Sequence, residues 1–190
     1  MRSNYKIFKI IAFSLGGLVV LWLIYDFIKS YKKIDKNYVN ANTSFLKKDY
    51  KGALNLYKIA SELDPENLYA IEGQARSLMR MKKYKESEET FKLVLQKDNE
   101  FLPALTNIAI LYDTIGKYNK AIIYYRKALK QDKRVSKRMS LLKRFIKNIQ
   151  LKPSTIQERL FYLEEQLKLD IGKRKLKNKD IDSLQPDYEM

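Results

Sequence analysis

The hydrophobic residues of this chain follow two patterns, one continuous and one periodic. Residues 10–25 read IIAFSLGGLVVLWLIY without a charge, and the apolar stretch widens to residues 7–28 if Lys9 and Asp26 lie at its edges. As a helix, residues 7–28 would span roughly 33 Å, slightly more than the ~30 Å hydrocarbon core of a bilayer. The continuous pattern therefore predicts a helix that can cross a membrane.

Three interpretations of this helix compete: a cleaved signal peptide, a buried globular helix and a permanent anchor. The residues after the run, YDFIKSYKK, offer no pair of small residues suited to cleavage. A helix that is apolar on every face needs a larger protein around it to be buried. We therefore expect residues 1–29 to be a transmembrane anchor, in which Ala12 and Gly16 have the small-xxx-small spacing of helix dimers.

Basic residues flank the predicted anchor almost equally, so the positive-inside rule barely favours one orientation. Arg2, Lys6 and Lys9 precede the apolar run, and Lys29, Lys32, Lys33 and Lys36 follow it. Because a short positive N-terminal tail is typical of a signal anchor, we expect the soluble part on the extracytoplasmic side. The cytoplasmic side is the alternative.

The periodic pattern repeats every 34 residues. Small residues stand at 41, 75 and 109, at 53, 87 and 121, and at 60, 94 and 128, with Val94 as the largest of them; aromatic residues stand at 50, 84 and 118 and at 57, 91 and 125. Within each copy the spacing i, i+4, i+7 places the small, aromatic and small residues on one helix face. A polar turn separates this helix from an earlier one, so each copy predicts two antiparallel helices whose backbones approach closely at the small residues.

These residues resemble the tetratricopeptide repeat family, and residues 102–135 match its pattern best. The resemblance implies an all-α fold: three helix-turn-helix repeats forming a short solenoid over residues 34–135, divided into 34–67, 68–101 and 102–135. It does not select a partner, because one fold serves many functions. The first copy departs from the pattern at Asn37 and Asn40, and the second has Ser87 and Val94 in place of alanine.

Residues 136–171 are expected to form C-terminal capping helices, because the last repeat would otherwise expose an apolar edge. The first capping helix follows the stripe Val135, Met139, Leu142, Ile146 and Ile149. The second begins at the capping box Thr155 and Glu158, carries the stripe Ile156, Leu160, Leu163 and Leu167, and ends near Gly172. Residues 172–190 are expected to be a disordered charged tail.

The composition argues against catalysis. The chain has no Cys and no His, so thiol nucleophiles, imidazole acid/base chemistry and the usual zinc sites are excluded, and its one Gly-Gly pair lies inside the apolar run. We expect no enzyme activity, no cofactor and no metal site. The formal net charge of +16, from 38 Lys and Arg against 22 Asp and Glu, indicates attraction to anionic surfaces.

Basic residues concentrate in residues 133–152, which contain no acidic residue. This segment is either a solvated outer face or a docking surface for an anionic partner such as an acidic protein, lipid headgroups or RNA. Nucleic acid is the least expected of these, because Phe145 is the only aromatic residue there. The predicted basic surface consists of Lys133, Arg134, Lys137, Arg138, Lys143, Arg144 and Lys147.

The family resemblance implies a concave groove lined by the first helix of each repeat. The positions that commonly face it in the family correspond to Tyr38, Asn42, Phe45, Tyr69, Glu72, Arg76, Met79, Thr106, Ile110 and Asp113. Some of these side chains are instead expected to pack between helices. Cochaperones of the family grip a C-terminal carboxylate at five positions, which here hold Tyr38, Asn42, Gly73, Pro103 and Asn107; only Asn42 matches, so this clamp is not expected.

Together these features predict a membrane-anchored adaptor that binds a peptide or protein partner in its groove, in envelope assembly or secretion. The alternative is a structural membrane protein that oligomerises through its anchor or through the Ile156–Leu167 stripe, or that docks on an anionic surface through residues 133–152.

Overall fold

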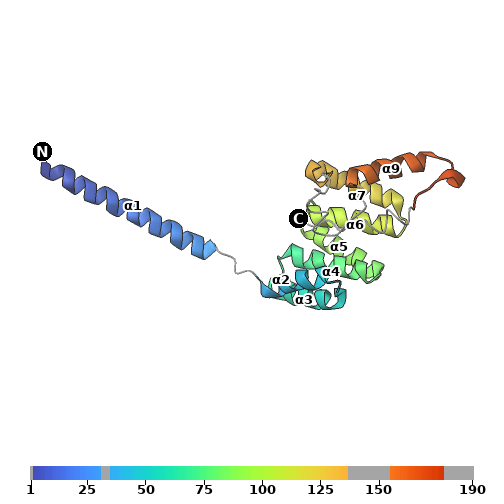
Figure 1. Cartoon of the computed structure of the whole chain (residues 1–190), viewed down its shortest axis with the longest axis horizontal. Coiled ribbons are helices and arrows are strands. Elements are labelled where there is room, and N and C mark those ends of the chain that lie inside the picture. The colour runs from blue at the N-terminus through green and yellow to red at the C-terminus, as the bar shows by residue number, and fades with distance from the viewer. Residues whose placement is uncertain (1, 31–34, 137–154, 178–190) are drawn as a thin grey trace. The chain divides into compact units, whose positions relative to one another are not determined.

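The computed structural model describes residues 2–30, 35–136 and 155–177, and every regular element within them is helical. The chain divides into two compact units, Met1–Asp35 and Lys36–Met190 (Figure 1). The described part of the first unit is one helix, α1 (Arg2–Ser30). The second unit is a stack of helices with its own hydrophobic core.

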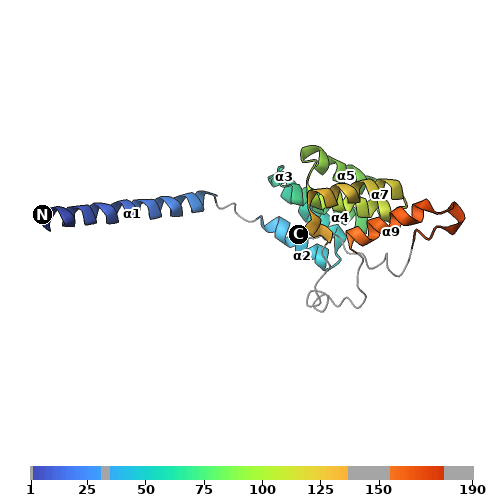
Figure 2. The ribbon, with the colours of Figure 1, turned by 90° about the horizontal axis from the view of Figure 1, so that it is seen from above.

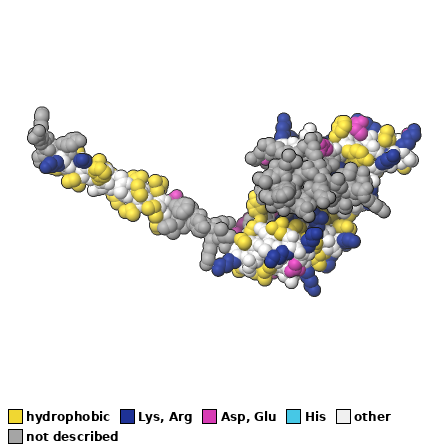
Figure 3. Space-filling model, in the orientation of Figure 1, with side chains coloured by type: hydrophobic (Ala, Val, Ile, Leu, Met, Phe, Trp, Pro, Cys, Tyr) yellow, Lys and Arg dark blue, Asp and Glu magenta, His cyan; other side chains and the backbone are white. Residues whose placement is uncertain are grey.

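Helix α1 is long and apolar enough between Lys6 and Asp26 to cross a membrane. Its side chains in that span are exposed, and Figure 3 shows hydrophobic groups along it with lysines near its N-terminal end. A signal sequence near an N-terminus would have the same length and composition. The finding is a candidate span, and permanent anchoring remains a proposal.

The second unit contains three antiparallel helix pairs: α2 (Lys36–Leu46) with α3 (Tyr50–Leu63), α4 (Leu68–Arg80) with α5 (Tyr84–Lys97), and α6 (Leu102–Thr114) with α7 (Tyr118–Gln131). The pairs stack because α3 packs on α4 and α5 packs on α6. In Figure 2, α3, α5 and α7 lie along one side, and α2 and α4 lie along the other. The predicted all-α solenoid is confirmed.

The residues that repeat at 34-residue spacing form the core of this stack. The side chains of the three small columns and of the second aromatic column are completely buried: Ala41, Ala75 and Ala109; Ala53, Ser87 and Ala121; Ala60, Val94 and Ala128; Tyr57, Phe91 and Tyr125. Ser87, which stands where the other copies have alanine, is accommodated because its hydroxyl donates to the carbonyl of Ala75 at 2.7 Å. A larger side chain at any small position would force the paired helices apart.

The turn inside each repeat also recurs at the 34-residue spacing. Lys48, Lys82 and Gly116 have φ values of 64°, 61° and 77°, in the left-handed region. After the third of these residues, the amide of Lys117 donates to the carbonyl of Tyr112 at 2.8 Å, and the amide of Gly116 donates to Asp113 at 3.1 Å. This is a Schellman-type end, which satisfies the last carbonyls of the first helix and reverses the chain.

Helix α9 (Ile156–Lys168) closes the C-terminal end of the stack by packing on α7 and on the 3₁₀ turn η1 (Lys133–Ser136). The predicted capping box is present: the Glu158 amide donates to Thr155 Oγ1 at 3.1 Å, and the Thr155 amide donates to the Glu158 carboxylate at 2.9 Å. Ile156, Leu160 and Leu163 of the stripe are buried in the chain's own core, and the partly buried Leu167 packs against them. The stripe therefore packs inside this chain, which argues against the alternative in which it joins two copies.

Two boundaries differ from the sequence prediction. Helix α9 ends at Lys168, short of Gly172, and a second 3₁₀ turn, η2 (Ile171–Lys173), follows it. Residues 172–177, assigned to a disordered tail, instead fold back on α9: Arg159 donates to the Leu176 carbonyl at 3.0 Å, and the Lys175 amide donates to the Gln166 side chain at 2.7 Å. The first capping helix over 137–149 and the tail over 178–190 lie outside the described residues.

Candidate partner-binding groove

The ten predicted groove residues all lie on the first helices α2, α4 and α6. Their exposure differs sharply along the stack. Tyr69 is 41% exposed, and Tyr38 and Asn42 are partly exposed. The other seven are buried: Phe45, Glu72, Arg76, Met79, Thr106, Ile110 and Asp113.

The first and second repeats meet through an aromatic and cationic contact. The guanidinium carbon of Arg76 on α4 lies 4.7 Å from the centroid of the Phe45 ring on α2. The hydroxyl of Tyr57, on α3, donates to Asn42 Oδ1 at 2.6 Å and receives a long hydrogen bond from Arg76 at 3.5 Å. These contacts hold three predicted groove residues from two repeats in one cluster.

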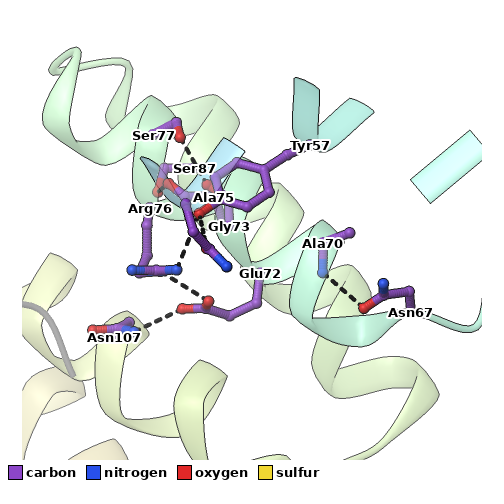
Figure 4. A network of polar contacts seen from close by, with 11 residues as sticks. Tyr57, Asn67, Ala70, Glu72, Gly73, Ala75, Arg76, Ser77, Ser87 and Asn107 are labelled. Atoms are coloured by element: carbon purple, nitrogen blue, oxygen red, sulfur yellow. Dashed lines mark hydrogen bonds and ion pairs between the residues drawn. The ribbon is translucent and has the colours of Figure 1, made fainter. Parts of the chain in front are cut away.

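The second and third repeats meet through Glu72. Its carboxylate accepts a hydrogen bond from Arg76 Nε at 2.9 Å, within one helix turn, and another from Asn107 Nδ2 of α6 at 2.7 Å. Figure 4 shows the Glu72 carboxylate between Arg76 of its own helix and Asn107 of the next first helix. Because Glu72 and Arg76 are both buried, each charge depends on the other for the interactions that water would otherwise supply.

Burial also changes the acidity of Tyr57 at this cluster. Desolvation raises the pKa of Tyr57 to about 12, although the positive charge of Arg76 counteracts part of that effect. The phenol therefore stays protonated at physiological pH and keeps its donor for Asn42.

At the third repeat, helix α9 reaches a predicted groove residue. Arg159 Nε donates to Asp113 Oδ2 and Arg159 Nη2 donates to Asp113 Oδ1, both at 2.7 Å. The Tyr125 hydroxyl donates to the same Oδ2 at 3.2 Å. Asp113 and Arg159 are both buried, so α9 blocks ligand access to Asp113 in this conformation.

Comparisons with known proteins agree on the fold. The family model described as Tetratricopeptide repeat matches residues 102–134. The first tetratricopeptide repeat domain of Spaghetti (RPAP3), solved with an HSP90 peptide bound, superposes with a TM-score of 0.55 at 16% identity, over 70% of this chain and 91% of that one. Residues 102–134 therefore match a tetratricopeptide repeat, and the stack of helix pairs has the fold of a tetratricopeptide repeat domain.

Two curated relatives match part of this chain. Superkiller complex protein 3 of Homo sapiens is 32% identical over 89 residues, which are 42% of this chain and 6% of the relative. Tetratricopeptide repeat protein 8 of Caenorhabditis elegans is 34% identical over 77 residues, 40% of this chain and 15% of the relative. The chain thus spans a small fraction of both relatives, so only the repeat fold carries over from them.

A second solved structure, the tetratricopeptide repeat domain of Sgt2 from Aspergillus fumigatus, has a TM-score of 0.49 at 20% identity, over 52% of this chain and 66% of that chain.

Other predicted groove residues do not join the central cluster. Tyr69 packs edge-on against Phe101, which precedes α6, with ring centroids 4.9 Å apart. Met79, Thr106 and Ile110 are buried, as expected for repeat residues that pack between helices. The Thr106 hydroxyl has no hydrogen-bond partner among the residues that the structure describes.

Sequence reasoning missed two residues of this region. Asn107 did not match the family's carboxylate clamp, yet it joins the second and third repeats through Glu72. Arg159 belonged to no candidate set, although a basic residue between Ile156 and Leu163 on an apolar stripe is a signal of a buried acidic partner. Neither partner was predictable from local spacing, because each lies more than thirty residues away.

The predicted basic surface falls largely outside the described residues. Lys133 lies in η1 with an exposed side chain, and Arg134 lies in the same turn. Lys137, Arg138, Lys143, Arg144 and Lys147 are not described. Within residues 2–30, 35–136 and 155–177, no group of three acidic side chains lies close enough to hold a metal ion.

Proposed function

We propose that this protein is a membrane-anchored adaptor that binds an extended or helical peptide of a partner protein at the first-repeat end of its concave groove. The observation that carries the proposal is the arrangement of first helices across repeats. Buried contacts among Phe45, Arg76, Glu72 and Asn107 hold α2, α4 and α6 side by side, so that the exposed sides of these helices form one continuous surface. A preorganised surface of this kind binds a peptide without losing conformational entropy of its own.

The exposure pattern supports the first-repeat end as the binding site. Tyr38, Asn42 and Tyr69 are the predicted groove residues that retain solvent exposure, whereas Asp113 is paired with Arg159. Tyrosines offer large contact areas at low entropic cost, and an asparagine side chain can hydrogen-bond a peptide backbone. The proposed ligand therefore contacts these three side chains, in the manner of a peptide in a helix-lined groove.

The same geometry argues against a clamp for a C-terminal carboxylate. Gly73 stands at a clamp position, and a Cβ atom there would lie 2.5 Å from the ring of the buried Tyr57, so no asparagine side chain fits. Asn42 already accepts from Tyr57, and Asn107 donates to Glu72. The partner proposed here is thus recognised through internal residues of its chain.

The groove assignment is tested with photocrosslinking in native membranes. A photoreactive residue replaces Asn42 in one full-length variant and Asn55, an exposed residue of α3, in the control. We expect a specific crosslinked protein from position 42 and not from position 55. The combined variant Tyr38→Ala and Tyr69→Ala should abolish that crosslink, whereas Asn55→Ala should leave it intact. Equal crosslinking from both positions would show that the groove is not the binding site.

The anchor is tested on the same full-length protein. Intact N-terminal peptides in the mature protein and resistance to carbonate extraction support permanent anchoring through α1. Loss of residues up to the end of the apolar run would identify a signal peptide instead. Protease accessibility in intact and opened vesicles then decides the proposed extracytoplasmic orientation, and co-isolation with envelope assembly or secretion components tests the proposed process.

A further inference from the structure

The outer side of the third repeat carries a cluster of lysines around two tyrosine rings. The rings of Tyr112 on α6 and Tyr124 on α7 have centroids 5.5 Å apart. Lys120 Nζ lies 5.3 Å and Lys117 Nζ 5.9 Å from the Tyr112 centroid, and Lys127 Nζ lies 5.3 Å from the Tyr124 centroid. These five residues are called the lysine–tyrosine cluster.

Three members of this cluster, Lys120, Tyr124 and Lys127, lie on α7, a helix without acidic residues. Residues 118–131 contain Lys120, Arg126, Lys127 and Lys130 and no acidic residue. Lys117 pairs with Glu88 at 3.3 Å and Arg126 with Glu164 at 2.8 Å. Lys120 and Lys127 are exposed, and among the described residues no carboxylate lies within ion-pair distance of either. Their charges are available to an external anion.

An exposed apolar residue lies between these two lysines. Ile123, which is 51% exposed, is three residues after Lys120 and four before Lys127, so all three project from one face of α7. Basic residues flanking an aliphatic side chain, with a tyrosine beside them, suit the boundary between lipid headgroups and acyl chains. A purely electrostatic site for a soluble anion would not require the exposed isoleucine.

We propose that this face of α7 docks on anionic lipid headgroups of the membrane in which α1 is anchored. The proposal rests on the proposed anchor, because the attraction of two or three lysines is weak for a freely diffusing protein. Only residues 31–35 separate α1 from α2, and five residues extend at most about 20 Å. An inserted α1 therefore keeps the solenoid near the bilayer, where a high effective concentration makes a weak surface sufficient.

The first experiment is lysine acetylation footprinting of the full-length protein in vesicles of phosphatidylcholine alone or with about 30% phosphatidylserine. We expect Lys120 and Lys127 to be modified about threefold more slowly in the anionic vesicles, with the difference lost in about 0.5 M NaCl because salt screens the attraction. Lys51 and Lys58 on α3, two exposed lysines with the same seven-residue spacing, serve as internal controls. Equal rates at Lys120 in both vesicles would overturn the proposal.

The second experiment uses matched charge reversals and a lipid-proximity probe. Because the chain has no cysteine, Ile123→Cys carries one environment-sensitive dye, and Ile59→Cys on α3 is its control. Brominated lipids in anionic vesicles should quench the dye at 123 and not at 59. Lys120→Glu with Lys127→Glu should abolish that quenching, whereas Lys51→Glu with Lys58→Glu, which changes the net charge equally, should not. Circular dichroism confirms that both variants fold.

The outcomes separate this proposal from the anchor. Flotation with neutral vesicles reports insertion of α1 alone, whereas the difference between neutral and anionic vesicles reports α7. Failure to float with neutral vesicles refutes the anchor. Flotation with neutral vesicles together with equal modification of Lys120 and Lys127 in both kinds of vesicle refutes docking and leaves the anchor in place. Protection of these lysines by RNA or an acidic peptide, without protection by phosphatidylserine, would assign another partner and refute docking on lipid.

Discussion

Arg159 and Asp113, which are 46 residues apart in the sequence, form a buried, bidentate ion pair. It joins α9 to the first helix of the third repeat, and the hydroxyl of Tyr125 completes the carboxylate's hydrogen bonds. The pair both closes the end of the solenoid and covers a residue that would otherwise face the groove. Loss of this pair would therefore both destabilise the fold and expose Asp113 to the groove.

Breaking this pair from one side should be costly. Arg159→Leu leaves the Asp113 carboxylate buried without its cation, which we expect to lower the free energy of unfolding by about 3–5 kcal/mol. Urea unfolding of the unit from Lys36 to Met190, followed by circular dichroism, measures the loss. The double variant Arg159→Leu with Asp113→Leu should be more stable than Arg159→Leu alone, because it buries no charge. Additive losses from the two substitutions would show that the two charges do not interact.

The ionised Glu88 carboxylate should make the free energy of unfolding depend on pH. Desolvation raises the pKa of Glu88, but hydrogen bonds from Lys92, Tyr112 and Lys117 outweigh it and lower that pKa to about 2 from the ordinary 4.5. A carboxyl with a lower pKa in the folded state stabilises the fold above its unfolded pKa, and this contribution disappears as the pH falls from 4.5 towards 2.

The measurement compares Glu88→Gln with the wild type at several pH values. Near pH 6 the variant should be less stable by about 1 kcal/mol, a modest figure because the lysine partners are half exposed to solvent. The difference in the free energy of unfolding between the variant and the wild type should disappear as the pH approaches 2. Glu89→Gln removes an exposed charge from the next position and controls for net charge. A constant gap at all pH values would exclude an ionised Glu88 as its cause.

Glycine at the left-handed turn positions should make the protein more stable. Lys48 and Lys82 occupy backbone conformations that cost an L-residue with a Cβ about 1 kcal/mol relative to glycine, which the third repeat has at 116. Lys82→Gly should therefore raise the thermal midpoint, and Gly116→Ala should lower it. A Cβ at Gly116 would meet no atom closer than 3.8 Å, so the loss would come from φ and not from a clash. Unchanged midpoints in both variants would contradict this account.

The helix pairs were predictable because their signal is local. Ala53, Tyr57 and Ala60 lie within two helical turns, and a spacing of 34 residues returns each of them to the same environment in the next copy. The capping box at Thr155 and Glu158 was predictable for the same reason, since its two residues are three positions apart. In contrast, nothing in the lysines at 48 and 82 signals a left-handed turn, because lysine has no preference for that conformation.

Sequence spacing alone was enough to specify the helices, their pairing and the residues that let them approach, since these depend on periodicity within about forty residues. Which groove side chains stay accessible depended on the packed fold: Glu72 meets Asn107, and Asp113 meets Arg159, only after separate repeats and α9 have stacked. Side chains distant in sequence become neighbours through packing, and burial then decides whether a polar residue serves a ligand or the chain itself.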